Sequence, residues 1–264
     1  MSPRNVYSKT LWDARRSLVA WMVGTAAIAA VYAGFYPQLA GGGMAEAIAN
    51  FPQAIKDAFR LDDISSAAGY LQSTTFGLLV PLLVMINGIV SGTRALAGDE
   101  EAGHLDVLLA HPLSRTRLVL HRFAAVATGA VLTAALVFLA MLAIRDSARL
   151  DTVSIGGFAA QALNVALLGC VFAALALAIG AISGRRALTL GITTAIGVLA
   201  YAATTVGPQV GAAWTRTLSP FHYYSGGEPL KHGLDWAGSC VLAVTCVVLV
   251  AVGVWALRGR DLRS

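Results

Sequence analysis

Six long apolar runs, separated by polar segments, organise this chain of 264 residues. They extend over about 18–36, 76–97, 123–144, 158–182, 188–206 and 238–257. Roughly 20 helical residues cross a hydrocarbon core of about 30 Å, and backbone groups in lipid must be hydrogen-bonded within their own segment. Because the runs have this length and lack the alternation of strands, the pattern predicts an all-α, polytopic membrane protein with six transmembrane helices. No internal repeat divides the chain, so we expect one transmembrane domain over residues 1–264.

Composition and charge agree with a membrane protein and favour one orientation. Hydrophobic residues make up 57% of the chain and charged residues 12%, whereas a soluble domain has about 25% charged residues. Lys and Arg in short loops are retained on the cytoplasmic side. With both termini inside, that side holds thirteen basic residues: Arg4, Lys9, Arg15, Arg16, Arg94, Arg115, Arg117, Arg122, Arg185, Arg186, Arg258, Arg260 and Arg263. The outer side holds six: Lys56, Arg60, Arg145, Arg149, Arg216 and Lys231. We expect a multi-pass protein of the cell membrane with cytoplasmic termini, whose net charge requires no nucleic-acid partner.

The segment before the first apolar run alternates apolar and charged side chains. Leu11, Trp12 and Leu18 alternate with Lys9, Asp13, Arg15 and Arg16. This pattern favours a basic interfacial helix that lies on the inner leaflet and then turns into the first span. A disordered basic tail is the alternative.

Two polar segments are expected on the outer side. In the first, Asn50 is a candidate N-cap before Pro52, and apolar residues recur at four-residue spacing, which predicts an amphipathic surface helix. The second, residues 207–237, concentrates aromatic side chains: Phe221, Tyr223, Tyr224 and Trp236. Aromatic residues at this depth typically form an interfacial belt, and a role in substrate release is the alternative.

The apolar runs offer little chemistry. Their cores contain no ionisable residue except Arg94, which is close enough to the cytoplasmic end to extend out of the lipid. Asn87, Gln161 and Asn164 are expected to hydrogen-bond between helices. Pro81, Gly88 and Gly92 in the second run are interpreted either as kinks along a transport path or as ordinary close packing. The three cysteines, Cys170, Cys240 and Cys246, all fall within spans and are read as small core residues.

No motif for catalysis is present. The sequence has no GxxxxGK[ST] phosphate loop, no HExxH and no GxSxG, and its histidines lack paired ligand spacing. We therefore expect no catalytic residue, metal or cofactor in this chain. If the protein transports a substrate, the energy is expected to come from another polypeptide.

A charged stretch, GDEEAGHLDVLLAHPLSRTR at residues 98–117, separates the second and third runs. Its acids cannot lie in lipid, and acids suit the positive N-terminal end of a helix, so a cytoplasmic helix is predicted to begin here. Leu105, Leu108 and Leu109 then share one apolar stripe. Pro112 disfavours a helix at the preceding residue and marks its end.

This stretch resembles the signature of ABC type-2 exporter permeases, in which acids precede a Gly, a leucine-rich segment and a Pro-x-Ser-Arg sequence. The matching residues are Glu100, Glu101, Gly103, Leu105, Leu108, Leu109, Pro112, Ser114 and Arg115, whereas His104 replaces the usual Thr. The resemblance implies that the segment is a coupling helix that docks on a separate ATP-hydrolysing subunit. It assigns this role to Glu100, Glu101, Gly103, Leu105, Leu108, Leu109, Pro112 and Arg115. A helix lying on its own inner leaflet is the alternative.

The resulting interpretation is a permease subunit of an ABC exporter that moves a lipophilic substrate, such as an antibiotic, a drug or a lipid-like compound, outward. The implied partners are two copies of an ABC ATPase subunit, which would bind the ATP, and a second permease protomer, identical or paralogous. A non-transporting membrane anchor or assembly factor is the first rival. An intramembrane enzyme is disfavoured, because the spans lack the carboxylates and histidines that it needs.

Overall fold

The computed structural model describes residues 6–39, 51–52, 66–101 and 114–259, and all regular structure within these ranges is helical. The long helices are α1 (Val6–Gly34), α6 (Val80–Thr93), α9 (Arg115–Ile144), α10 (Ile155–Ser183), α11 (Arg186–Thr205) and α14 (Trp236–Gly259). The short ones are α2 (Tyr36–Leu39), α5 (Ala67–Ser73), α7 (Asp99–Glu101), α12 (Pro220–Ser225) and α13 (Pro229–His232). Two π-helical turns, η2 (Thr75–Leu79) and η3 (Arg94–Gly98), flank α6, and two 3-10 helices, η4 (Gly207–Val210) and η5 (Ala213–Leu218), follow α11.

Among the residues that the structure describes, six helical segments are long and apolar enough to cross a membrane: Val6–Gln38, Ala67–Gly98, Arg115–Ile144, Ile155–Ser183, Arg186–Thr205 and Trp236–Gly259. Each contains most or all of one predicted apolar run, so the all-α fold class with six transmembrane helices is confirmed. Most of these helices extend beyond the apolar runs, because polar residues at the ends of a run continue the same helix. The protein is therefore a multi-pass membrane protein.

The N-terminal helix differs from the expectation of a separate interfacial helix. α1 continues without a break from Val6 to Gly34, and its basic residues Arg15 and Arg16 are exposed within this single helix. Its 29 residues span about 43 Å, which exceeds a hydrocarbon core of about 30 Å. The first turns can thus leave the lipid by extension alone, and no bend is required to place the basic residues in the headgroups.

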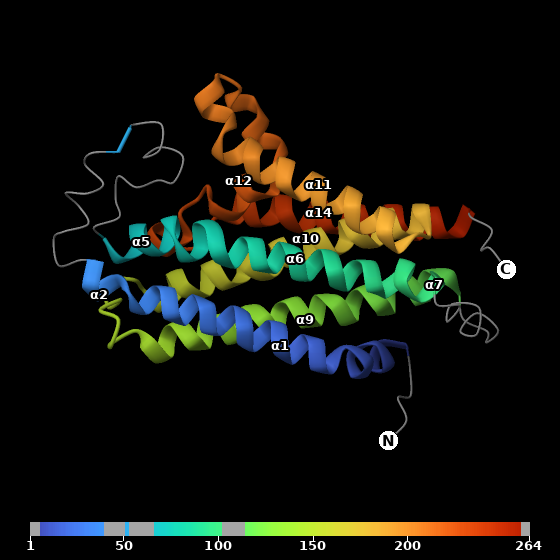
Figure 1. Ribbon diagram of the computed structural model, residues 1–264, viewed down its shortest axis with the longest axis horizontal. Coiled ribbons are helices and arrows are strands. Elements are labelled where there is room, and N and C mark those ends of the chain that lie inside the picture. Colours follow the sequence, from blue (N-terminus) through green and yellow to red (C-terminus); the bar gives the residue numbers. More distant parts are fainter. Residues whose placement is uncertain (1–5, 40–50, 53–65, 102–113, 260–264) are drawn as a thin grey trace.

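The helix α10 forms the centre of the bundle and packs against α6, α9, α11 and α14 (Figure 1). In the most apolar 18-residue stretch of α10, 72% of the residues are buried, whereas 17% are buried in the corresponding stretch of α11. Local signals fix the ends of α10: the Ser154 hydroxyl accepts a hydrogen bond from the Gly157 amide at 2.9 Å, and Gly184 adopts the left-handed conformation with φ of 61°. The helix α1 lies on the outside of the bundle against α9.

The glycines of α6 allow a close approach to α10. A Cβ at Gly88 would lie 2.7 Å from the carbonyl oxygen of Gly169, and one at Gly92 would overlap the backbone of Ala173. Of the two interpretations of these glycines, the structure therefore supports close packing. Pro81 has no amide proton for the Gly77 carbonyl four residues earlier, and the Tyr201 hydroxyl donates to that carbonyl at 3.3 Å instead.

The aromatic residues of 207–237 are only partly placed as predicted. Phe221 and Tyr224 of α12 are buried, and the Phe221 ring packs 5.5 Å from Phe172 and 5.2 Å from Tyr201, measured between ring centroids. The prediction of an interfacial belt is wrong for these two residues, because α12 folds back onto α10 and α11. Trp236 is 73% exposed and stays compatible with a belt. The predicted outer amphipathic helix begins at Asn50, and nearly all of it lies outside the described residues.

The two ends of the bundle differ in what they carry (Figure 1). The start of α1, the short helix α7 and the end of α14 lie at one end, whereas α2, α5 and α12 lie at the other.

Of the three cysteines, Cys246 is buried, Cys170 is half-buried and Cys240 is exposed, so only Cys246 fits the expected core position well.

Candidate functional site

Three of the eight predicted coupling residues, Glu100, Glu101 and Arg115, belong to the part of the chain that the structure describes. The other five, Gly103, Leu105, Leu108, Leu109 and Pro112, lie outside the described residues, and they include the whole predicted apolar stripe. The described residues define how both flanks of this segment are attached to the bundle.

The first flank is attached to α11 through Glu101. Its carboxylate Oε1 accepts a hydrogen bond from the backbone amide of Arg186 at 2.9 Å. Arg186 is the first residue of α11, and the side chain of the preceding Arg185 provides no cap. A carboxylate at a helix N-terminus satisfies an otherwise unpaired amide and interacts favourably with the helix dipole. Glu101 was expected in the first turn of a new cytoplasmic helix, whereas its carboxylate interacts with the N-terminus of α11. Glu101 itself follows η3 without a break in helical structure.

The second flank is attached to α14. Nη1 of Arg115 donates to the carbonyl oxygen of Leu257 at 2.9 Å, and Nε of Arg258 donates to the Thr116 hydroxyl at 2.9 Å. The Ser114 hydroxyl caps α9 by accepting from the Arg117 amide at 3.3 Å. The segment between the flanks therefore begins at a contact with α11 and ends at contacts with α14.

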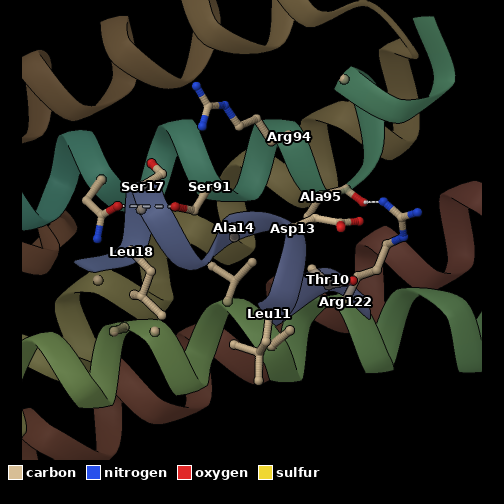
Figure 2. A pocket seen from close by; sticks show the side chains of 18 of the residues that line it. Thr10, Leu11, Asp13, Ala14, Ser17, Leu18, Ser91, Arg94, Ala95 and Arg122 are labelled. Atoms are coloured by element: carbon tan, nitrogen blue, oxygen red, sulfur yellow. Dashed lines mark hydrogen bonds between the residues drawn. The ribbon is translucent and has the colours of Figure 1, made fainter. Parts of the chain in front are cut away.

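A cavity of about 470 Å³ lies beside this region, between α1, α6 and α9 (Figure 2). A single residue from each of α10 and α11, Gly169 and Arg186, completes its wall. Near the cavity, the Tyr7 hydroxyl of α1 is 3.0 Å from the Thr128 hydroxyl of α9, which fixes these two helices against each other. The volume lies within the range of about 300–1,000 Å³ that is typical of small-molecule pockets.

Charged residues line this cavity to an extent that the apolar runs did not predict. They are Lys9 and Asp13 from α1, Arg94 from η3, Arg122 from α9 and Arg186 from α11. Arg122 is only 4% exposed, and its Nη1 donates to the carbonyl oxygen of Ala95 at 2.6 Å. In Figure 2 Arg122 reaches towards Ala95, whereas Arg94 extends away from Asp13. Arg94 is exposed, as its position near the end of the span predicted.

The polar residues within the spans have distinct partners. Asn87 lines the cavity, and its Oδ1 accepts from the Ser91 hydroxyl one turn away at 3.2 Å. Asn164 does link helices, because its Nδ2 donates to the Tyr224 carbonyl at 3.0 Å and its Oδ1 accepts from the Ser239 hydroxyl at 2.8 Å. This second cluster ties α10 to α12 and α14, away from the residues that line the cavity. Burial raises the pKa of the Tyr224 phenol, which therefore stays protonated.

The six spans place the protein in the class of multi-pass helical membrane proteins. Residues 10–258 match the family model described as "Multidrug efflux system permease Rv1217c, C-terminal domain". The match covers most of the chain, so the chain belongs to this family of efflux permeases, in agreement with the resemblance to ABC type-2 exporter permeases. Comparison with curated proteins gave no match.

Proposed function

We propose that this chain is the membrane-spanning subunit of an ATP-driven ABC exporter that moves a lipophilic substrate outward. A second permease protomer and two copies of a separate ATPase subunit, which would bind the ATP, complete the complex. Membership of an efflux permease family supports transport over the alternative of a membrane anchor or assembly factor. The finer assignment, to an ATP-driven exporter, is supported by the sequence of residues 100–115.

The attachment of both flanks of residues 102–113 carries the proposal. A coupling helix transmits force only if its ends are fastened to the helices that must move. Glu101 fastens one flank to the N-terminus of α11, and Arg115 fastens the other to the end of α14. Displacement of this segment by a closing ATPase pair would therefore act on α11 and α14 together, and the bundles would rock between two arrangements.

We place the protein in the plasma membrane, with the end of the bundle that carries α7 facing the cytoplasm. The start of α1, α7 and the end of α14 share that end, as an even number of spans requires (Figure 1). The described basic residues are concentrated there, and Arg145, Arg149, Arg216 and Lys231 are at the opposite end. This distribution supports cytoplasmic termini.

The proposal is tested by Leu108→Glu in a tagged chain purified from its native membranes. Burying Leu108 against a partner would contribute about 1.5–3 kcal/mol, so the substitution should weaken co-purification of ATP hydrolysis and abolish its stimulation by substrate. Membrane levels should stay normal, because the predicted stripe lies outside the spans. Leu190→Glu within α11 is the comparison, and it should instead reduce membrane levels.

Two results would contradict the proposal. One is a Leu108→Glu chain that transports and co-purifies with hydrolysis as well as the unmodified chain does. The other is robust ATP hydrolysis by the unmodified chain after every co-purifying ATPase has been removed, because the sequence contains no phosphate loop.

A further inference from the structure

The cavity between α1, α6 and α9 has a charged end and an uncharged end, where Ser17, Asn87 and Thr133 line it together with apolar and small residues. From Arg122 to Thr133 along α9, and from Lys9 to Leu18 along α1, the lining extends over about 13–16 Å of helix. Its basic residues lie at the end that carries α7, and Leu18 and Ser17 lie on the opposite side of the view from Arg122 and Ala95 (Figure 2). The cavity therefore runs from the region of the headgroups into the hydrocarbon.

Positive charge dominates the first end. Four lining residues are basic, Lys9, Arg94, Arg122 and Arg186, and one is acidic, Asp13, which leaves a net charge of +3. Within the described part of the chain, the side chains of Lys9, Asp13 and Arg94 have no ion-pair or hydrogen-bond partner. Asp13 thus does not neutralise the cations around it by direct pairing. An anionic group at this end would be attracted by several cations, of which Arg122 is buried and the others are exposed.

Small and apolar residues close the other end. A Cβ at Gly169 would lie 2.9 Å from Cγ1 of Val84 and 3.3 Å from Cβ of Ala130, so α6, α9 and α10 meet there without a gap. Leu18 of α1 approaches Gly129 of α9 closely, since a Cβ at this glycine would be 3.0 Å from the Leu18 Cδ1. An apolar group at this end would contact Leu18 and Val84.

From this gradient we propose that the cavity binds an amphiphile that has one anionic group, such as a carboxylate or a phosphate, and an apolar body. The anionic group lies among Lys9, Arg94 and Arg122, and the apolar body reaches towards Leu18 and Val84. This deepens the proposed export function, on which it rests for the direction of transport, by assigning the chemical class of a substrate. A cationic amphiphile of the same length should not bind, because the net positive charge of the lining would repel it.

The test uses the purified chain, without an ATPase, in phosphatidylcholine nanodiscs. The probe is dodecanoate with a photoactivatable diazirine at the end of its chain. Labelling should map to α1, α6 and α9 near Leu18 and Val84. Unlabelled dodecanoate and dodecyl phosphate should compete with the probe, whereas dodecyltrimethylammonium should not. Equal competition by the cationic amphiphile, or labelling confined to the lipid-facing surfaces of α11 and α14, would overturn the proposal.

Two variants change the charge of the site in opposite directions. Arg94→Gln removes an exposed cation that has no partner within the described residues, so it should leave the fold intact and weaken the apparent affinity about three- to tenfold. Asp13→Asn removes the acid and should strengthen the apparent affinity for the probe. Arg16→Gln is the matched control, because Arg16 is exposed on α1 but does not line the cavity. Unchanged affinities in both test variants, or an equal loss in the control, would refute an anion site.

Nanodiscs that also contain phosphatidylglycerol identify the source of the anion. If this lipid competes with the probe, the occupant is an anionic bilayer lipid, and if it does not, the occupant is a free amphiphile. Both results retain the anion site. Because labelling is measured without an ATPase, it is independent of the Leu108→Glu experiment. Normal labelling with normal ATP coupling in Leu108→Glu would contradict the proposed mechanism alone, whereas failed labelling with a coupling defect would contradict only the anion site.

Discussion

The contact between α6 and α10 leads to a quantitative prediction for Gly92→Ala. The added methyl group would overlap the backbone of Ala173 and lie 3.0 Å from its Cα. A backbone atom in the middle of a buried helix cannot rotate away as the end of a flexible side chain can. The two helices must therefore separate, and such overpacking costs about 1–3 kcal/mol.

The matched control is Gly24→Ala in α1, where a Cβ would meet no atom within 4 Å. Both substitutions replace a glycine inside a helix by alanine, which favours the helix by about 0.5–1 kcal/mol. The propensity contribution is common to the two variants, so their difference isolates the cost of overpacking. Gly92→Ala should be less stable than Gly24→Ala by about 1–3 kcal/mol.

The measurement is reversible unfolding of the purified chain in mixed micelles by titration with sodium dodecyl sulfate, monitored by circular dichroism. Gly88→Ala should fall between the other two variants, because its closest backbone contact, 2.7 Å to the Gly169 carbonyl oxygen, involves less overlap. If Gly92→Ala unfolds at the same or a higher denaturant fraction than Gly24→Ala, the helices do not approach as closely as described, and the reasoning fails.

Two further predictions concern the end of the bundle that carries α7. Glu101→Ala removes the cap of α11 and should lower the free energy of unfolding by about 0.5–1 kcal/mol. It should also reduce substrate-stimulated ATP hydrolysis more than the basal rate. The control is Asp146→Ala, which removes an exposed acid at the opposite end and should change neither quantity. If the two variants behave alike in the hydrolysis assay, the hydrogen bond of Glu101 to α11 has no role in coupling. Single cysteines at Ser2 and Ser264, in a chain without its three native cysteines, should resist a membrane-impermeant thiol reagent in intact cells, and labelling of either would reverse the orientation.

The sequence predicted the elements whose signal is local and failed where a contact joins distant segments. Hydropathy located all six spans, because length and apolar composition alone decide whether a helix can cross a membrane. The continuity of α1 was missed, because alternating basic and apolar residues are compatible with two structures. One is a separate helix on the membrane surface, and the other is a long transmembrane helix whose first turns extend out of the lipid. Phe221 and Tyr224 were assigned to the surface because their burial depends on α12 folding back onto α10 and α11.

The candidate site was also predicted only in part. The charged stretch was recognised from its own residues, but the partner of Glu101 is an amide in α11, which no local pattern specifies. The cavity was not predicted at all, because it needs α1, α6 and α9 to be placed side by side. One signal was available, because Arg122 lies just before the predicted span 123–144 and belongs to the same helix. A cation at such a position can be buried, donate a hydrogen bond to a neighbouring helix and line a pocket.

The attachment of α11 gives this helix the mechanics of a lever. Only residues 184–185 join it to α10, and Glu101 holds the same end, so a tilt of α11 would pivot about its N-terminus. Its 20 residues are about 30 Å long, and a tilt of about 10° at the pivot therefore displaces the far end by about 5 Å. That end carries η5 and α12 with it, because the hydroxyls of Thr215 and Ser219 donate to the Ala203 and Ala200 carbonyls. A small angular change at one membrane face would thus be amplified into a displacement of several ångströms at the other.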